Sequence, residues 1–115
     1  MTPIFCPDKE KADQLILDIR GTINLFGKGP KYKNFRLLLE TFARNFEAVV
    51  YPDSSSFSPN QDQVNSLLDE MYFYQRAYYK RSRGKISNVF QGLCLLTIQA
   101  RGAFYVDAPK RETAP

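Results

Sequence analysis

Residues 58–82, SPNQDQVNSLLDEMYFYQRAYYKRS, are the most informative part of the sequence about the fold. Ser58 can cap a helix, Pro59 suits the first helical position, and Gln61 completes a capping box. Behind this start, apolar side chains recur at intervals of three and four residues, which places them on one face of a helix. They are Val64, Leu67, Leu68, Met71, Tyr74 and Tyr78. The stretch therefore predicts an amphipathic helix that reaches about Ser82 and buries that face.

Two segments before this stretch show the same helical spacing. Residues 8–26 begin with acidic side chains, which suit the positive end of a helix dipole, and residues 27–30 contain two glycines and a proline that end the helix. Residues 31–51 have a wide apolar stripe, and Pro52 ends it. Their last five residues also have strand propensity. We favour a helix there because the 3.6-residue period continues to the end of the segment.

The last segment, residues 85–100, is the most apolar of the four. Its expected core face consists of Ile86, Val89, Phe90, Leu93, Leu96 and Ala100. Cys94, Leu95 and Ile98 add apolar surface on other sides, so we expect this helix either to be central or to be covered by a partner. Gly102 is expected to end it.

Four amphipathic segments with short connections predict an all-α fold, a compact bundle of about four to five helices. With 115 residues, of which 43% are hydrophobic, the chain can bury one modest core. We therefore expect a single helical domain over residues 1–106. Residues 104–106 can pack back on the bundle, and the polar residues 107–115 are predicted to form a flexible tail.

The composition argues against an enzyme. The chain contains no histidine, which excludes Ser-His-Asp and Cys-His nucleophilic sites, and two cysteines alone do not make a zinc site. Cys6 and Cys94 are expected to be reduced thiols. The acidic pairs along the chain are typical of solvated helix faces. We therefore predict no catalytic residue, no metal site and no cofactor.

The N-terminal segment lacks the basic region and apolar run of a signal peptide. No apolar run approaches the roughly 20 residues that span a bilayer. We expect a cytoplasmic protein with no membrane partner.

Charge and aromatic side chains cluster in residues 71–85, which contain five cations and no acid. On a helical wheel, the side opposite the apolar stripe has cations and rings in one line. The residues on or near that side are Tyr72, Arg76, Tyr79, Lys80 and Arg83, and Arg81 and Lys85 add positive charge to the same stretch. Cations meet phosphate and rings stack on bases, so this face is a candidate nucleic-acid surface.

A second basic patch lies in and just after the first connection. It consists of Lys28, Lys31, Lys33 and Arg36, with Tyr32 and Phe35 among them. Two such patches suit a groove that follows an RNA or DNA backbone, because no base-reading motif is present. Two other interpretations stay open: a solvated basic face, and a surface that binds an acidic protein.

Two stretches resemble the small all-helical subunit of type III CRISPR effector complexes. FRLLLETFARNF at residues 35–46 resembles that family's early helix, in which an arginine precedes leucines. LDEMYFYQRAYYKRSRG at residues 68–84 resembles a later helix, with two tyrosines around a basic position and then a Gly-Arg element. Here that element is reversed, as Arg83 and Gly84, and the region after it is shorter than in the family.

The resemblance implies a non-catalytic subunit for antiviral defence that binds RNA, stacks with other subunits or copies of itself, and lines the path of the guide–target duplex. It implies backbone contacts from Arg36, Arg76, Lys80, Arg81 and Arg83.

A second likeness concerns the helical domain of archaeal replication-complex proteins that bridge helicase and polymerase. It is confined to the basic residues 80–86 and to residues 98–102. The alternative function is a protein-interaction module or adaptor. It could be a replication adaptor, as this likeness implies, or a viral or plasmid regulator. Its basic face would then bind an acidic protein.

Overall fold

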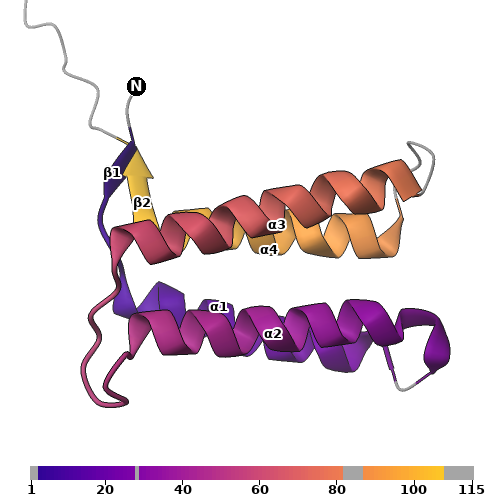
Figure 1. Cartoon of the computed structure of the whole chain (residues 1–115), viewed down its shortest axis with the longest axis horizontal. Coiled ribbons are helices and arrows are strands. Elements are labelled where there is room, and N and C mark those ends of the chain that lie inside the picture. Colours follow the sequence, from indigo (N-terminus) through magenta and orange to yellow (C-terminus); the bar gives the residue numbers. More distant parts are fainter. Residues whose placement is uncertain (1–2, 28, 82–86, 108–115) are drawn as a thin grey trace, which may run out of the picture.

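Four helices and a pair of short strands form the described part of the computed structural model, which covers residues 3–27, 29–81 and 87–107 (Figure 1). The elements are β1 (Pro3–Phe5), α1 (Lys9–Leu25), the short 3-10 helix η1 (Pro30–Tyr32), α2 (Lys33–Val50), α3 (Gln61–Arg81), α4 (Asn88–Phe104) and β2 (Tyr105–Asp107). The predicted all-α bundle is confirmed.

The helices alternate in direction and form two layers, with α1 and α2 in one and α3 and α4 in the other (Figure 1). Helix α1 packs against α2 and α4, and α3 packs against α4 and α2. This is the up-down-up-down arrangement that short connections between amphipathic helices favour. The beginning of α2, the end of α3 and the beginning of α4 therefore lie at one end of the bundle, and the strands lie at the other.

Polar caps and one glycine fix several helix ends. The Asp8 carboxylate accepts a hydrogen bond from the Lys11 N–H at 3.1 Å, and the Ser87 hydroxyl accepts one from the Phe90 N–H at the same distance. Gly27 ends α1 with a φ of +66°, a left-handed conformation that glycine adopts without a Cβ clash.

Helix α3 begins at Gln61, two residues after the predicted first helical position Pro59, and a different residue caps it. The Asn60 side chain accepts a hydrogen bond from the Gln63 N–H at 3.1 Å, and its carbonyl accepts the first helical bond, from Val64, at 2.9 Å. Asn60 is therefore the N-cap. The predicted Ser58 cap is wrong, since the Ser58 N–H instead donates to the Val50 carbonyl at 2.8 Å and ties the loop to the end of α2.

The end of α4 also differs from the prediction. The helix continues through Gly102 to Phe104, because Ala103 and Phe104 are fully buried and hold the last turn against the core. The choice of helix for the end of α2 is confirmed, since α2 continues to Val50.

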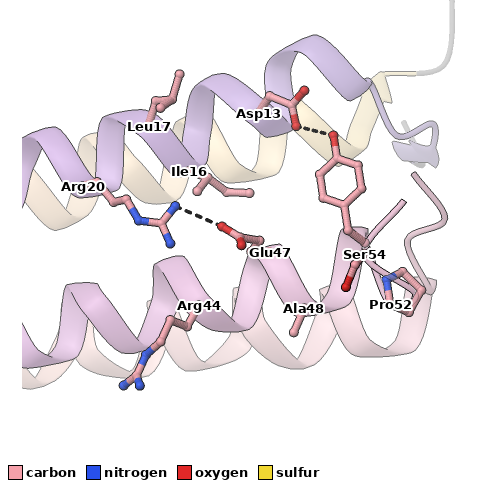
Figure 2. A pocket seen from close by; sticks show the side chains of 10 residues that line it. Asp13, Ile16, Leu17, Arg20, Arg44, Glu47, Ala48, Pro52 and Ser54 are labelled. Carbon is pink, nitrogen blue, oxygen red and sulfur yellow. Dashed lines mark hydrogen bonds and ion pairs between the residues drawn. The ribbon is translucent and has the colours of Figure 1, made fainter. Parts of the chain in front are cut away.

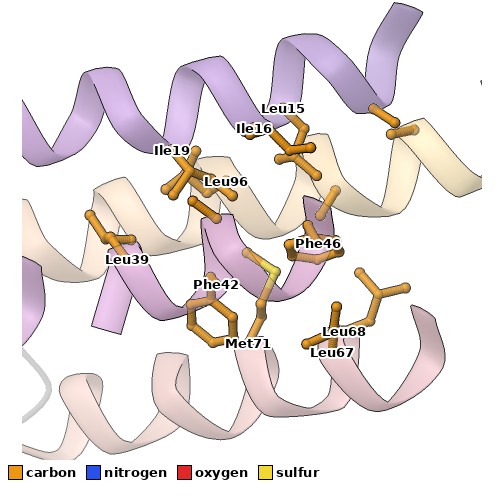
Figure 3. Packing of buried hydrophobic residues seen from close by; sticks show 14 of the residues in the cluster. Leu15, Ile16, Ile19, Leu39, Phe42, Phe46, Leu67, Leu68, Met71 and Leu96 are labelled. Carbon is orange, nitrogen blue, oxygen red and sulfur yellow. The ribbon is translucent and has the colours of Figure 1, made fainter. Parts of the chain in front are cut away.

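One hydrophobic core joins all four helices (Figure 3). Side chains from every helix meet in it, including Leu15 and Ile19 of α1, Leu39, Phe42 and Phe46 of α2, Leu67, Leu68 and Met71 of α3, and Leu96 of α4. At the strand end, the Phe46 and Phe104 rings stack with centroids 5.9 Å apart. The predicted apolar faces of α2 and α3 lie toward this core, with Tyr74 and Tyr78 half-buried at its edge.

The strand pair is an element that the helical patterns do not predict. β1 and β2 are antiparallel, with Ile4 opposite Val106 and Phe5 opposite Tyr105, so both ends of the described chain meet. The Tyr105 hydroxyl donates a hydrogen bond to the Asn65 side chain and accepts one from Gln61 at 3.3 Å, which fixes β2 to α3. Asp107, assigned to the tail by the sequence prediction, is the last residue of β2 and pairs with Pro3.

Helix α4 is not central, because one of its sides faces solvent. Leu95 and Ile98 on that side are 68% and 71% exposed. Whether a partner covers them stays a prediction.

Candidate nucleic-acid interface

The exposed side of α3 has the residues that the helical wheel places there. Tyr72, Arg76, Tyr79 and Lys80 are all exposed, whereas Met71 on the opposite side is fully buried. The division of residues 71–80 into a core face and an outer face is therefore confirmed. We call these four exposed residues the α3 stripe.

Helix α4 adds residues to this surface that the sequence analysis did not include. The rings of Tyr79 and Phe90 lie 5.0 Å apart between centroids, so α4 closes one side of a hollow beside the α3 stripe. This hollow is lined by Gln75, Arg76, Tyr79, Lys80 and Phe90.

A second hollow lies farther along the same pair of helices, toward the strands. It is lined by Tyr72, Ile98, Arg101, Gly102, Tyr105 and Asp107. Arg101 is exposed and extends the cations of the α3 stripe to α4. It is the single charged residue between positions 86 and 106. An isolated cation in an apolar helix is a sequence signal that could have identified Arg101 as a candidate binding residue.

The second predicted patch is only partly open to a ligand. Lys31 and Lys33 are exposed, and the Lys31 ammonium lies 5.3 Å from the centroid of the Tyr32 ring. Arg36 is half-buried and donates a hydrogen bond to the Gly29 carbonyl at 2.8 Å. One of its donors therefore stabilises the connection between α1 and α2.

A series of ring contacts connects the two patches. Phe26 lies edge-to-face with both Tyr32 and Phe35, at 4.9 Å in each case, and Phe35 contacts Tyr78 at 5.5 Å. The Arg81 guanidinium lies 5.3 Å from the Tyr78 ring. The structure thus brings both patches to the same end of the bundle. Tyr32 of the second patch lines one hollow, and Arg76 and Lys80 of the α3 stripe line another, so the two patches are neighbouring surfaces.

Lys28, Arg83 and Lys85 complete the predicted set. All three lie outside the residues that the structure describes.

The cations of the α3 stripe have no acidic partner in the described residues. Among the described residues, ion pairs join Lys9 to Asp13 at 3.4 Å and Arg20 to Glu47 at 3.0 Å, and both pairs lie on the α1–α2 side. Burial raises the pKa of the Tyr78 phenol, so this ring stays neutral beside Arg81 at physiological pH. The charge at this end of α3 is therefore positive and unneutralised by nearby carboxylates.

Another hollow, between α1 and α2, has a different character (Figure 2). Arg20 and Glu47 point toward each other across it, and the Tyr51 hydroxyl donates a hydrogen bond to the Asp13 carboxylate at 2.5 Å. Arg20 and Glu47 neutralise each other, and Asp13 pairs with Lys9 at 3.4 Å. The Arg20–Glu47 and Tyr51–Asp13 contacts hold α1 to α2.

Over the described ranges, no three acidic or cysteine side chains gather closely enough to hold a metal ion. Cys6 is exposed, Cys94 is half-buried, and both are free thiols. No helix in this part of the chain is long and apolar enough to cross a bilayer.

Comparisons of the chain with protein-family models, with curated proteins and with solved structures find no match.

Proposed function

We propose that this chain is a non-catalytic subunit of a larger assembly and that it holds a nucleic-acid backbone along the α3–α4 side of the bundle. The observation that supports the proposal most is the α3 stripe: Arg76 and Lys80 are exposed one turn apart, beside exposed tyrosines and without acidic partners in the described residues. Cations in this setting attract phosphate, and neighbouring rings suit bases or sugar edges.

Backbone binding fits this surface better than the reading of base edges in a duplex. The cations come from two helices, Arg76 and Lys80 from α3 and Arg101 from α4, so they follow a surface rather than project from one recognition helix. Phosphate contacts position a strand without specifying its sequence. We therefore expect binding that depends strongly on salt and weakly on sequence.

The test is the affinity of the double variant Arg76→Ala/Lys80→Ala for single-stranded RNA, single-stranded DNA and duplex DNA of equal length. Loss of two phosphate contacts should weaken binding about tenfold or more at low salt, to a similar extent for every sequence of one nucleic-acid type. Fluorescence anisotropy with labelled oligonucleotides measures it.

The matched control is Lys11→Ala/Arg44→Ala. It removes the same net charge, again from one lysine and one arginine, but both side chains are exposed on α1 and α2. This control should bind almost as tightly as the unmodified chain. Equal losses in the two double variants would indicate attraction by net charge alone, and no binding by the unmodified chain or its native complex would reject the proposal.

The resemblance to CRISPR small subunits leads to a narrower version of this proposal, in which the bound nucleic acid is a guide–target duplex. Backbone binding does not depend on it. Co-purification of the chain with CRISPR effector subunits and a guide RNA would support the narrower version, and its absence from such complexes would reject it.

The exposed Leu95 and Ile98 favour a second function, binding to another protein subunit. Apolar side chains at 68% and 71% exposure in one helix are a common feature of contact surfaces. A partner that stays bound after nuclease treatment and in high salt would indicate protein binding instead of, or in addition to, nucleic-acid binding.

A further inference from the structure

The hollow beside the α3 stripe combines three kinds of group at one place. Its volume is about 380 Å³, near the lower end of the range for small-molecule sites. Tyr79 and Phe90 form an aromatic wall, with their rings 5.0 Å apart and inclined at 49°. Arg76 and Lys80 line the same hollow and are exposed to solvent. A planar apolar group attached to an anion would match both the wall and the cations.

Gln75 adds an unused hydrogen-bond acceptor. Its Oε1 atom is buried and has no hydrogen-bond partner among the described residues, although Gln75 lines this hollow. A buried polar atom without a partner costs free energy, and such atoms are rare in folded proteins. A rotation of the Gln75 side-chain amide into the hollow would let an N–H group of a bound molecule satisfy this oxygen.

We propose that this hollow receives one nucleobase of the bound strand. The ring of the base would stack on the aromatic wall, an N–H on its edge would donate to Gln75 Oε1, and the adjoining phosphates would contact Arg76 and Lys80. The inference rests on the proposed nucleic-acid binding and makes it more specific. Every common base has at least one N–H on its pairing edge, so the site would prefer a base to no base rather than one sequence to another.

The site also determines which form of nucleic acid is preferred. In a duplex the pairing edges are occupied and the faces are stacked, so a base reaches such a hollow from a single strand or after flipping out. Single strands should therefore bind more tightly than duplexes of the same length.

The test compares two single-stranded DNA probes of about 16 nucleotides, one of deoxyadenosine and one made of abasic sites with the same phosphates. Stacking of one base changes affinity by roughly 5-fold to 150-fold. Gln75→Met removes the acceptor at similar size, and Phe90→Leu removes one ring. Both should weaken binding of the deoxyadenosine probe fivefold or more and leave the abasic probe unchanged. Gln63→Met makes the same change at an exposed position of α3 outside the hollow, and this variant should bind both probes like the unmodified chain.

The possible outcomes distinguish a failure of this inference from a failure of the proposed nucleic-acid binding. If the unmodified chain binds both probes equally, the hollow holds no base and backbone binding stands. If neither probe binds, the proposed function fails and the inference fails with it. Equal weakening of both probes in Gln75→Met also overturns the inference. Thermal melts identify unfolded variants, and Gln75→Met should melt no lower than the unmodified chain, because it removes an unpaired buried atom.

Discussion

Two arginines show that the surroundings of a side chain determine whether it is open to a ligand. Arg36 and Arg76 are both predicted phosphate contacts, each in a basic, aromatic stretch. Arg76 is exposed on the α3 stripe, whereas Arg36 is half-buried and donates to the Gly29 carbonyl. The wheel places Arg76 correctly because its helix is regular. The bond of Arg36 could not be predicted, since it depends on how the chain turns between α1 and α2.

Tyr51 and Lys9 both contact the Asp13 carboxylate, and these contacts make the stability of the protein depend on pH at high pH. The Tyr51 hydroxyl donates to Asp13, and this hydrogen bond raises the phenol's pKa above its ordinary value near 10, with burial adding to the effect. The hydrogen bond and charge of Asp13 also raise the pKa of the Lys9 ammonium above its ordinary 10.5. Both groups hold their protons more tightly in the folded state, so their stabilising effect is complete below about pH 10 and is lost above it.

Asp13→Asn should therefore destabilise the protein at pH 8 and make less difference at pH 11. The measurement is the urea midpoint of unfolding for both proteins across this range. Other tyrosines and lysines titrate in both chains, so the difference between the two curves isolates Asp13. A constant difference from pH 8 to pH 11 would show that this cluster does not contribute as described.

At the scale of elements, the start of α3 gives a direct comparison between two candidate caps. Asn60→Ala should lower the free energy of unfolding by about 1 kcal/mol, because it leaves the Gln63 N–H without its acceptor. Ser58→Ala should change it much less, since Ser58 contacts Val50 through its backbone N–H, which alanine keeps. Chemical denaturation measures both. A larger loss in Ser58→Ala would restore the sequence-based capping box.

The helices themselves could be predicted because the apolar spacing of each is long and regular. The helix ends are harder to predict, because the capping residue depends on a single hydrogen bond and on the path of the adjoining loop. The passage of α4 through Gly102 depends on the burial of Phe104 against Phe46, a contact between residues far apart in the chain. The strand pair likewise joins the two ends of the described chain, and three-residue strands have too few side chains to show an alternating pattern.

At the scale of the whole molecule, the candidate site consists of residues that only the bundle brings together. The α3 stripe could be predicted from one helix. Phe90, Arg101 and the buried oxygen of Gln75 join it through the packing of α4 on α3, which no local pattern describes. The proposed surface is therefore a property of the fold as much as of residues 71–85.

The salt dependence of binding to a single-stranded oligonucleotide shows whether the α3 stripe contacts phosphates. Each neutralised phosphate contributes about 0.7 to the slope of log affinity against log salt concentration for single strands. The unmodified chain should show a steep slope. Arg76→Ala/Lys80→Ala should reduce it by about 1.4, and Lys11→Ala/Arg44→Ala should leave it almost unchanged. Equal slopes for the unmodified chain and Arg76→Ala/Lys80→Ala would contradict the assignment of the backbone-binding surface to α3.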